Sequence, residues 1–277
     1  MNFVQLSVLA FLVHLANSLA VLITALTADK TLKLPLTLTR FGGPPGSFEL
    51  DEVKVLWNVP LWALVFTFSA LAMVDHAAAA WLTLGMGDGN DLRTPFTDAR
   101  DFLIAGLMWF EYTFSASIMM VTILLLSGVT DLFTILMVIT AMFGSFSATM
   151  KTDANLYYSA SASLDGSRSY GDFMAIQDID ARFRSGLFWV GSELMLVPWI
   201  IVFASLFMAN PPGFVYAIVF TLFLLFCPFA VVQNYYVGMS PAWFMTNVHR
   251  RTRALVWCSI LAKTALVWQI YANALVL

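Results

Sequence analysis

The chain has 277 residues, of which 60% are hydrophobic and only 11% are charged, and its mean hydropathy is +0.81. Soluble domains carry about 25% charged residues, so this composition excludes a soluble globular protein and indicates an integral membrane protein. The net charge of −3 is small and no basic run suggests a nucleic-acid partner. Cys227 and Cys258 both fall in apolar segments, which argues against a disulfide framework. We expect neither a metal site nor an enzymatic activity.

Apolar windows of about 20 residues, the length that crosses a bilayer, recur seven times. They predict an all-α membrane protein, a single seven-helix domain over residues 1–277 embedded in lipid, with spans near residues 3–26, 57–84, 102–126, 132–150, 186–209, 213–238 and 252–275. The first window is too long for a signal-peptide core and lacks a basic leader and a cleavage site, so we expect a retained helix. Because the sequence stops at Leu277, just after the last window, we expect no output domain.

Two of the connections between spans are long. Residues 27–56 contain an alternating run at 34–39, a Gly- and Pro-rich turn at 42–46 and a second extended run at 48–55. This pattern predicts a small β-hairpin outside the membrane between the first two helices. Residues 151–185 are polar, Ser-rich and acidic, which predicts a loop with some amphipathic structure.

The basic residues indicate the orientation, because seven spans place the two termini on opposite sides. Nine belong to the side of the N-terminus: Arg93, Arg100, Lys151, Arg168, Arg182, Arg184, Arg250, Arg251 and Arg253. Four belong to the other side: Lys30, Lys33, Arg40 and Lys54. By the positive-inside rule we expect a cytoplasmic N-terminus and an extracellular C-terminus.

A few ionisable side chains remain inside the spans: His14, Asp75, His76, Glu111, Glu193 and Lys263. Glu111, Glu193 and Lys263 each follow the cytoplasmic start of their span by nine or ten residues. At about 1.5 Å of rise per residue, all three lie roughly 15 Å deep, near the midplane. We therefore expect one lysine and two carboxylates in a single layer of the bundle.

Lys263 is the most informative of these residues. A charge at the centre of a membrane helix costs on the order of 3 kcal/mol, so it is either paired or used chemically. A lysine amine can form a Schiff base with an aldehyde, and a nearby carboxylate such as Glu111 would keep that group charged. A purely structural buried ion pair is the alternative.

The other ionisable residues each leave two interpretations open. Glu193 is either a second counter-ion or proton acceptor, or a protonated carboxyl bonded to a carbonyl that Pro198 loosens. His14 and His76 are either proton relays or satisfied interior histidines. Asp75 adjoins His76 but points about 100° away around the helix, so we do not expect the two to share one site.

Several segments resemble the heliorhodopsins. Met108–Met119 is similar to their third helix and Ser259–Gln269 to their retinal-attachment helix. Shorter matches, which extend the resemblance over nearly the whole chain, are Gly43–Gly46, Val197–Ile200, Pro212–Tyr216 and Phe226–Gln233.

The resemblance implies retinal, all-trans in the dark, bound as a protonated Schiff base to Lys263, with Glu111 as counter-ion and Ser259 as a hydrogen-bonding neighbour. It implies further chromophore contacts from Tyr112, Met119, Trp189, Phe226 and Gln233. It also implies a homodimer, an extracellular hairpin after the first helix and a cytoplasmic N-terminus.

The chain departs from the family pattern at a few positions. Met108 stands where most members carry an arginine, and Glu193 stands where the residue is ordinarily apolar. A histidine that the family places on the second helix falls at Met73, with His76 one turn further on. These changes predict a retinal layer that is more acidic and richer in proton-exchanging groups.

Two functions fit this pattern best. The first is a photoreceptor without transport, which signals to an unknown partner. The alternative is a light-gated passive proton pathway through Glu111, Glu193 and His14 or His76, because ionisable residues at the midplane mark ion routes. A non-photochemical membrane protein would require the motif matches to be accidental.

Overall fold

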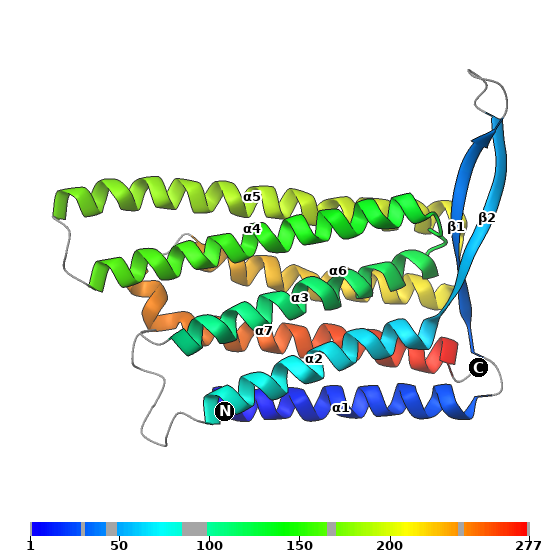
Figure 1. Ribbon diagram of the computed structural model, residues 1–277, viewed down its shortest axis with the longest axis horizontal. Helices are drawn as coiled ribbons and strands as arrows, with labels where there is room; N and C mark the ends of the chain where they lie inside the picture. The colour runs from blue at the N-terminus through cyan, green and yellow to red at the C-terminus, as the bar shows by residue number, and fades with distance from the viewer. Residues whose placement is uncertain are drawn as a thin grey trace.

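The computed structural model describes residues 2–28, 31–42, 49–84, 99–164, 170–237 and 241–275. Within them, seven long helices lie side by side and a two-stranded hairpin stands at one end of the bundle (Figure 1). The elements are α1 (Phe3–Thr27), β1 (Lys33–Gly42), β2 (Glu49–Pro60), α2 (Leu61–Leu84), α3 (Ala99–Leu126), α4 (Leu132–Leu164), α5 (Tyr170–Ala209), α6 (Gly213–Val237), α7 (Pro241–Ile270) and a π-helical turn (Tyr271–Leu275). Each of the seven helices contains a segment long and apolar enough to cross a membrane. The predicted seven-helix membrane fold with a small hairpin is confirmed.

The bundle is built around α3. This helix packs against α2 and α4 as sequence neighbours and also touches α5 and α6. α1 lies against both α2 and α7, and the two termini lie at opposite ends of the bundle (Figure 1). Burial of large apolar side chains, among them Phe68, Met120 and Leu222, joins α2, α3 and α6 in one core. Groups on the inner faces of α3 and α7 are therefore far from the surrounding lipid.

Local hydrogen bonds set the start of α1 and the end of α3. α1 starts with a capping box, in which the Asn2 side chain accepts from the Gln5 amide at 2.8 Å and the Gln5 side chain accepts from the Asn2 amide at 3.1 Å. α3 ends in a Schellman motif, because the amides of Gly128 and Val129 donate to the carbonyls of Leu125 and Leu124. Gly128 has φ +90°, the left-handed conformation that this motif requires at its glycine.

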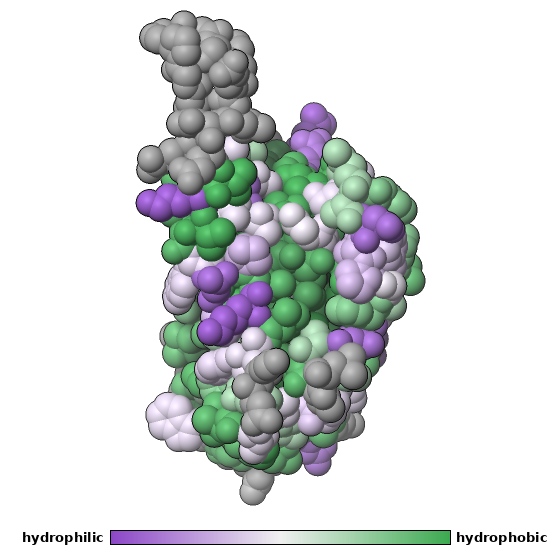
Figure 2. All heavy atoms as spheres, turned by 90° about the vertical axis from the view of Figure 1, so that its right-hand side faces the viewer, coloured by the Kyte–Doolittle hydropathy of each residue, from purple (hydrophilic) through white to green (hydrophobic). Residues whose placement is uncertain are grey.

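The hairpin is antiparallel, with its register running from Lys33 opposite Pro60 to Gly42 opposite Glu49. It stands at the same end of the bundle as the C-terminus (Figure 1), and Figure 2 looks onto this end, where hydrophilic side chains surround patches of hydrophobic ones. The turn expected at 42–46 lies, after Gly42, outside the described residues.

The hairpin is attached to the bundle through the connection between α3 and α4. The Thr37 amide donates to the Thr130 carbonyl at 2.8 Å, and the two hydroxyls lie 3.0 Å apart. Asp131 caps α4 by accepting from the Thr134 amide at 2.9 Å and its hydroxyl at 3.0 Å. Partial burial acts to raise the pKa of Asp131, but these hydrogen bonds outweigh it and hold the pKa below its usual value.

The loop expected at 151–185 is wrong in part. α4 continues to Leu164 and α5 begins at Tyr170, so most of this polar segment is helical, and Figure 1 shows both helices extending beyond their neighbours. Hydropathy detects only the part of a helix that contacts lipid, whereas backbone hydrogen bonding continues as long as no breaker intervenes. For the same reason α7 begins at Pro241, well before the expected 252.

We expect Gly128→Ala to destabilise the protein. The added Cβ would lie 3.1 Å from Cβ of Ala209 and would sit on a left-handed backbone, which costs about 1–2 kcal/mol. The matched control is Gly106→Ala, because Gly106 lies inside α3 with no atom within 4 Å of an added Cβ. Thermal unfolding in detergent should show a lower midpoint for the first variant and an equal or higher midpoint for the second. Equal losses in both would contradict the assignment.

Candidate functional site

Lys263 and Glu111 form an ion pair inside the bundle. Nζ of Lys263 on α7 donates to Oε1 of Glu111 on α3 at 2.6 Å and to Oγ of Ser259 at 2.8 Å. The two charged side chains are only 4% and 3% exposed. The Tyr112 ring lies 5.1 Å from the ammonium nitrogen, within range of a cation–π contact. Each partner therefore offsets the cost of burying the other, which is the condition for keeping either charge at this depth.

Lys263 lies in the wall of a cavity of about 270 Å³ between α3, α4, α5, α6 and α7. The wall is mostly aromatic and apolar. Trp199 packs edge-on against Phe223 and Phe226, with ring centroids 5.2 and 5.6 Å apart. Phe229 packs edge-on against Tyr112 at 5.7 Å. The amine thus meets a pocket shaped for an apolar molecule, with few polar groups to fix its orientation.

A second polar group lies where α1 and α2 meet. The rings of His14 and His76 stack with centroids 5.6 Å apart and an interplanar angle of 7°. Nδ1 of His76 lies 3.9 Å from Oδ2 of Asp75, and the Ser69 hydroxyl donates to the His14 carbonyl at 3.2 Å. All four side chains are buried. The expectation that Asp75 and His76 occupy separate sites is therefore wrong, because α2 is buried over an arc wide enough to hold both.

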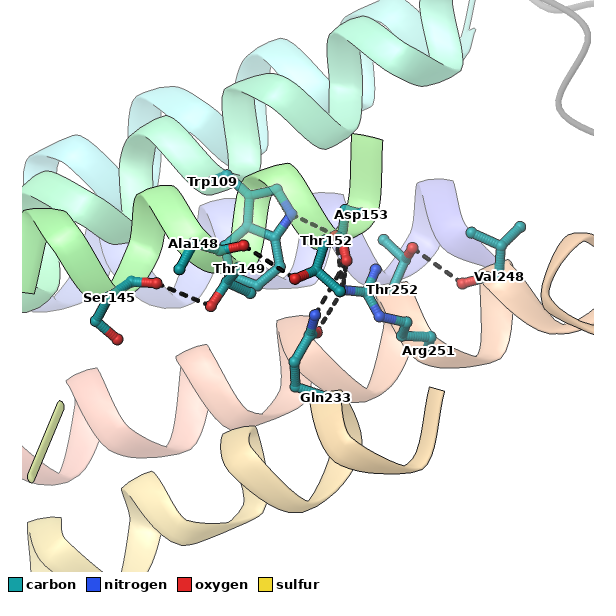
Figure 3. Close-up of polar contacts among 10 residues, drawn as sticks. All are labelled: Trp109, Ser145, Ala148, Thr149, Thr152, Asp153, Gln233, Val248, Arg251 and Thr252. Atoms are coloured by element: carbon teal, nitrogen blue, oxygen red, sulfur yellow. Dashed lines mark hydrogen bonds and ion pairs between the residues drawn. The ribbon is translucent and has the colours of Figure 1, made fainter. Parts of the chain in front are cut away.

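A buried hydrogen-bond network, drawn in Figure 3, includes Arg251 in the N-terminal half of α7. Nη2 of Arg251 donates to both carboxylate oxygens of Asp153 at 2.6 Å and to Oε1 of Gln233 at 2.5 Å. Nε1 of Trp109 donates to Asp153 at 2.6 Å, and Nε2 of Gln233 donates to it at 3.1 Å. Trp109 and Gln233 also line the cavity. One carboxylate thus links α3, α4, α6 and α7 next to the cavity.

The heliorhodopsin family model matches residues 4–155 and 170–275, which is nearly the whole chain. The chain belongs to the heliorhodopsin family. The family implies a retinal chromophore and a light-responsive protein. No curated protein sequence matches this chain.

A solved structure described as halorhodopsin, a light-driven chloride pump, is similar in fold to this heliorhodopsin. Its TM-score is 0.58 over 97% of this chain and 95% of that chain, at 14% sequence identity. At this identity the match shows a shared rhodopsin fold and carries no information on transport.

Most of the residues expected to contact the chromophore line the cavity of this heliorhodopsin. The wall includes Tyr112, Met119, Phe226, Gln233, Ser259 and Lys263. Trp189 is the exception, since it is 61% exposed on the outer face of α5. Phe188, Gly191 and Ser192 turn toward the cavity, and a residue one position away from such a face points about 100° aside. The expected contact from Trp189 is therefore corrected.

Glu193 needs the same correction. It follows Ser192, which lines the cavity, and its own side chain is exposed on the outside of the bundle. Its depth in the membrane was inferred from its distance along α5, but its rotation around the helix turns it away from Lys263. Glu193 therefore does not join Lys263 and Glu111 in the interior of the bundle.

Asp153 and Arg251 were not singled out from the sequence. Arg251 was counted among the basic loop residues, and Asp153 falls in the segment expected to be a loop. One sequence signal could have indicated them. Asp153 closely follows the predicted span 132–150 and Arg251 directly precedes the predicted span 252–275, so helices that extend past these spans place the two opposite charges inside the bundle.

We expect Arg251→Met to destabilise this heliorhodopsin strongly, because it leaves the Asp153 carboxylate buried without its cation. Removing one partner of a buried ion pair costs about 3–5 kcal/mol. Arg251→Met combined with Asp153→Leu should recover part of the loss. Arg250→Met is the control, because Arg250 is exposed. Thermal unfolding of Arg251→Met, Asp153→Leu, the double variant, Arg250→Met and the parent protein measures the coupling, and purely additive losses would exclude it.

Proposed function

We propose that this heliorhodopsin is a retinal photoreceptor, in which the amine of Lys263 holds the chromophore and the Glu111 carboxylate balances its charge. The observation that carries the proposal is the 2.6 Å ion pair between these residues at the wall of an apolar cavity. When bound, all-trans retinal supplies visible-light absorption and a change of shape on isomerisation. The buried lysine, which is costly in a membrane helix, then serves as the attachment point of the chromophore.

The residues around the cavity suit retinal. Aromatic rings from α5 and α6 and Met119 from α3 offer apolar contacts along a long hydrocarbon. The Lys263 amine is a nucleophile for an aldehyde. The Ser115 hydroxyl lines the cavity, is fully buried and has no hydrogen-bond partner in the described protein. A polar atom of this kind next to an otherwise apolar wall is a feature of small-molecule sites.

The protein's own groups control the proton on Lys263. Oε1 of Glu111 is close enough to Nζ to take a proton and leave the free amine that the covalent bond needs. Ser259, one turn before the lysine, accepts a hydrogen bond from Nζ and so orients it. With the chromophore in place, the same carboxylate favours the charged form of the nitrogen.

The ion pair also supplies a route from light to signal. Glu111 is on α3 and Lys263 is on α7, so moving the proton or the nitrogen changes the attraction between these two helices. The Arg251–Asp153 network joins the same two helices to α4 and α6 beside the cavity. A displacement in the cavity would reach it through Gln233 and Trp109.

The orientation and assembly form part of the proposal. The excess of basic residues, nine against four, supports a cytoplasmic N-terminus and an extracellular hairpin. We propose a homodimer that signals to a partner whose identity is unknown.

Passive light-gated proton transport is the second candidate. It is favoured by the buried cluster of His14, His76 and Asp75 at the α1–α2 contact, since interior ionisable groups mark proton routes. The exposed position of Glu193 weakens the route that was expected through that residue.

We expect Lys263→Ala to give a protein without visible colour after addition of retinal, because among the described residues Lys263 supplies the one lysine amine in the cavity wall. Lys151→Ala is the control and should stay coloured, since Lys151 is exposed on α4. The readout is the absorption spectrum of the purified protein. A coloured Lys263→Ala protein would disprove the covalent assignment.

Whole-cell voltage clamp under green light separates the two candidates. In cells whose pigment colour has been confirmed, a photoreceptor gives no light-dependent current at any voltage, and this is the outcome we expect. A current that reverses near the proton equilibrium potential would instead establish proton transport. Because Glu193 faces outward, Glu193→Gln should leave such a current unchanged.

A further inference from the structure

Asp75 is a buried carboxylate to which the proposed function gives no task. Its side chain is 7% exposed and that of its neighbour His76 is 2% exposed. The apolar residues Phe68, Ala72 and Ala79 on the same side of α2 are buried as well. Burying a carboxylate among them is costly unless a cation or a proton accompanies it.

The titratable groups that surround Asp75 come from all the helices packed on α2. α1 supplies His14, α2 itself His76, α3 Glu111 and Tyr112, and α7 Lys263. α2 packs directly against α3 and α7, the helices that carry Glu111 and Lys263, so the charges of both residues act on Asp75. Asp75 therefore shares the electrostatic environment of the Lys263–Glu111 pair, although it is on a different helix.

The charges in this environment do not balance if both carboxylates are ionised. Lys263 and Glu111 neutralise each other at 2.6 Å, so an ionised Asp75 would leave one negative charge in a low-dielectric interior. A proton on Asp75 or on His76 removes this imbalance. The pair is thus suited to hold one extra proton, either on the Asp75 carboxylate or on the His76 imidazole.

Unpartnered polar atoms mark the same place. Among the described residues, both ring nitrogens of His14, Nε2 of His76 and Oε2 of Glu111 are buried and make no hydrogen bond to another protein atom. Buried polar atoms nearly always have a partner, so water is expected between these groups. The 3.9 Å between Nδ1 of His76 and Oδ2 of Asp75 is too long for a direct hydrogen bond, so proton exchange between them needs a bridging water or a small side-chain rotation.

We propose that Asp75 is the second carboxylate of the Lys263 environment. It exchanges a single proton with His76 and, when ionised, it shares with Glu111 the balancing of the positive charge on Nζ of Lys263. In the exchange the O–H bond of Asp75 breaks and the N–H bond at Nδ1 of His76 forms, so the pair keeps its total charge. The part that concerns Nζ rests on the proposed retinal function.

The colour of the dark protein as a function of pH tests this proposal. A negative charge near Nζ stabilises the ground state, in which the positive charge lies close to that nitrogen, so protonating Asp75 should shift absorption to longer wavelength. We expect a pH-dependent shift in the parent protein that is lost in Asp75→Asn. It should persist in Glu193→Gln, the matched control with an outward-facing carboxyl.

Infrared titration of the retinal-free protein gives a readout that does not depend on the chromophore. The carboxyl C=O band that appears on acidification should lose one component in Asp75→Asn. If Asp75→Asn does not fold, Asp75→Glu keeps a carboxyl and should move that component to a different frequency.

The outcomes separate the two proposals. A parent protein that stays colourless with retinal would end the proposed function, and the infrared titration would still decide whether Asp75 titrates. A coloured parent protein whose shift with pH is unchanged in Asp75→Asn would overturn the role of Asp75 while leaving the photoreceptor intact.

Discussion

The arrangement of this heliorhodopsin depends on one electrostatic constraint, the need to keep the Lys263 ammonium inside an apolar bundle. Glu111 meets this need at 2.6 Å, and Ser259 adds a second acceptor at 2.8 Å. Because the two charged residues are on α7 and α3, the pair fixes the separation of these helices where the cavity begins. Because Lys263 also lines the cavity, the same interaction supports both the fold and the proposed retinal site.

Depth along a helix and rotation around it contribute separately to the site. Glu193 has the depth expected of a partner for Lys263, but α5 turns it outward, while Phe188, Ser192 and Met195 face the cavity. Asp75 was expected to lie apart from His76, because neighbouring residues point about 100° apart, yet α2 packs against both α1 and α3 and both residues are buried. The buried acidic residue is therefore Asp75, at the contact between α1 and α2, whereas Glu193 lies on the outer surface of the bundle.

A second ion pair, between Asp153 and Arg251, lies beside the cavity, and it has more hydrogen-bond partners than the Lys263–Glu111 pair. Asp153 receives hydrogen bonds from Arg251, Gln233 and Trp109, so four helices meet at one carboxylate (Figure 3). Such a buried network is disrupted as a unit when one member moves. Since Gln233 and Trp109 also line the cavity, the network adjoins the cavity directly.

The sequence by itself determined the membrane class, the seven helices, the hairpin and the pairing of Lys263 with Glu111. Hydropathy and the burial cost of a lone lysine depend on residue type and spacing, which are read directly from the chain. The tertiary structure alone decided that Trp189 and Glu193 face outward, that Asp75 joins the two histidines, and that Asp153 and Arg251 meet inside the bundle. These outcomes depend on how each helix is rotated and how far it continues past the lipid. Rotation and length follow from packing against neighbouring helices, and no single apolar window contains that information.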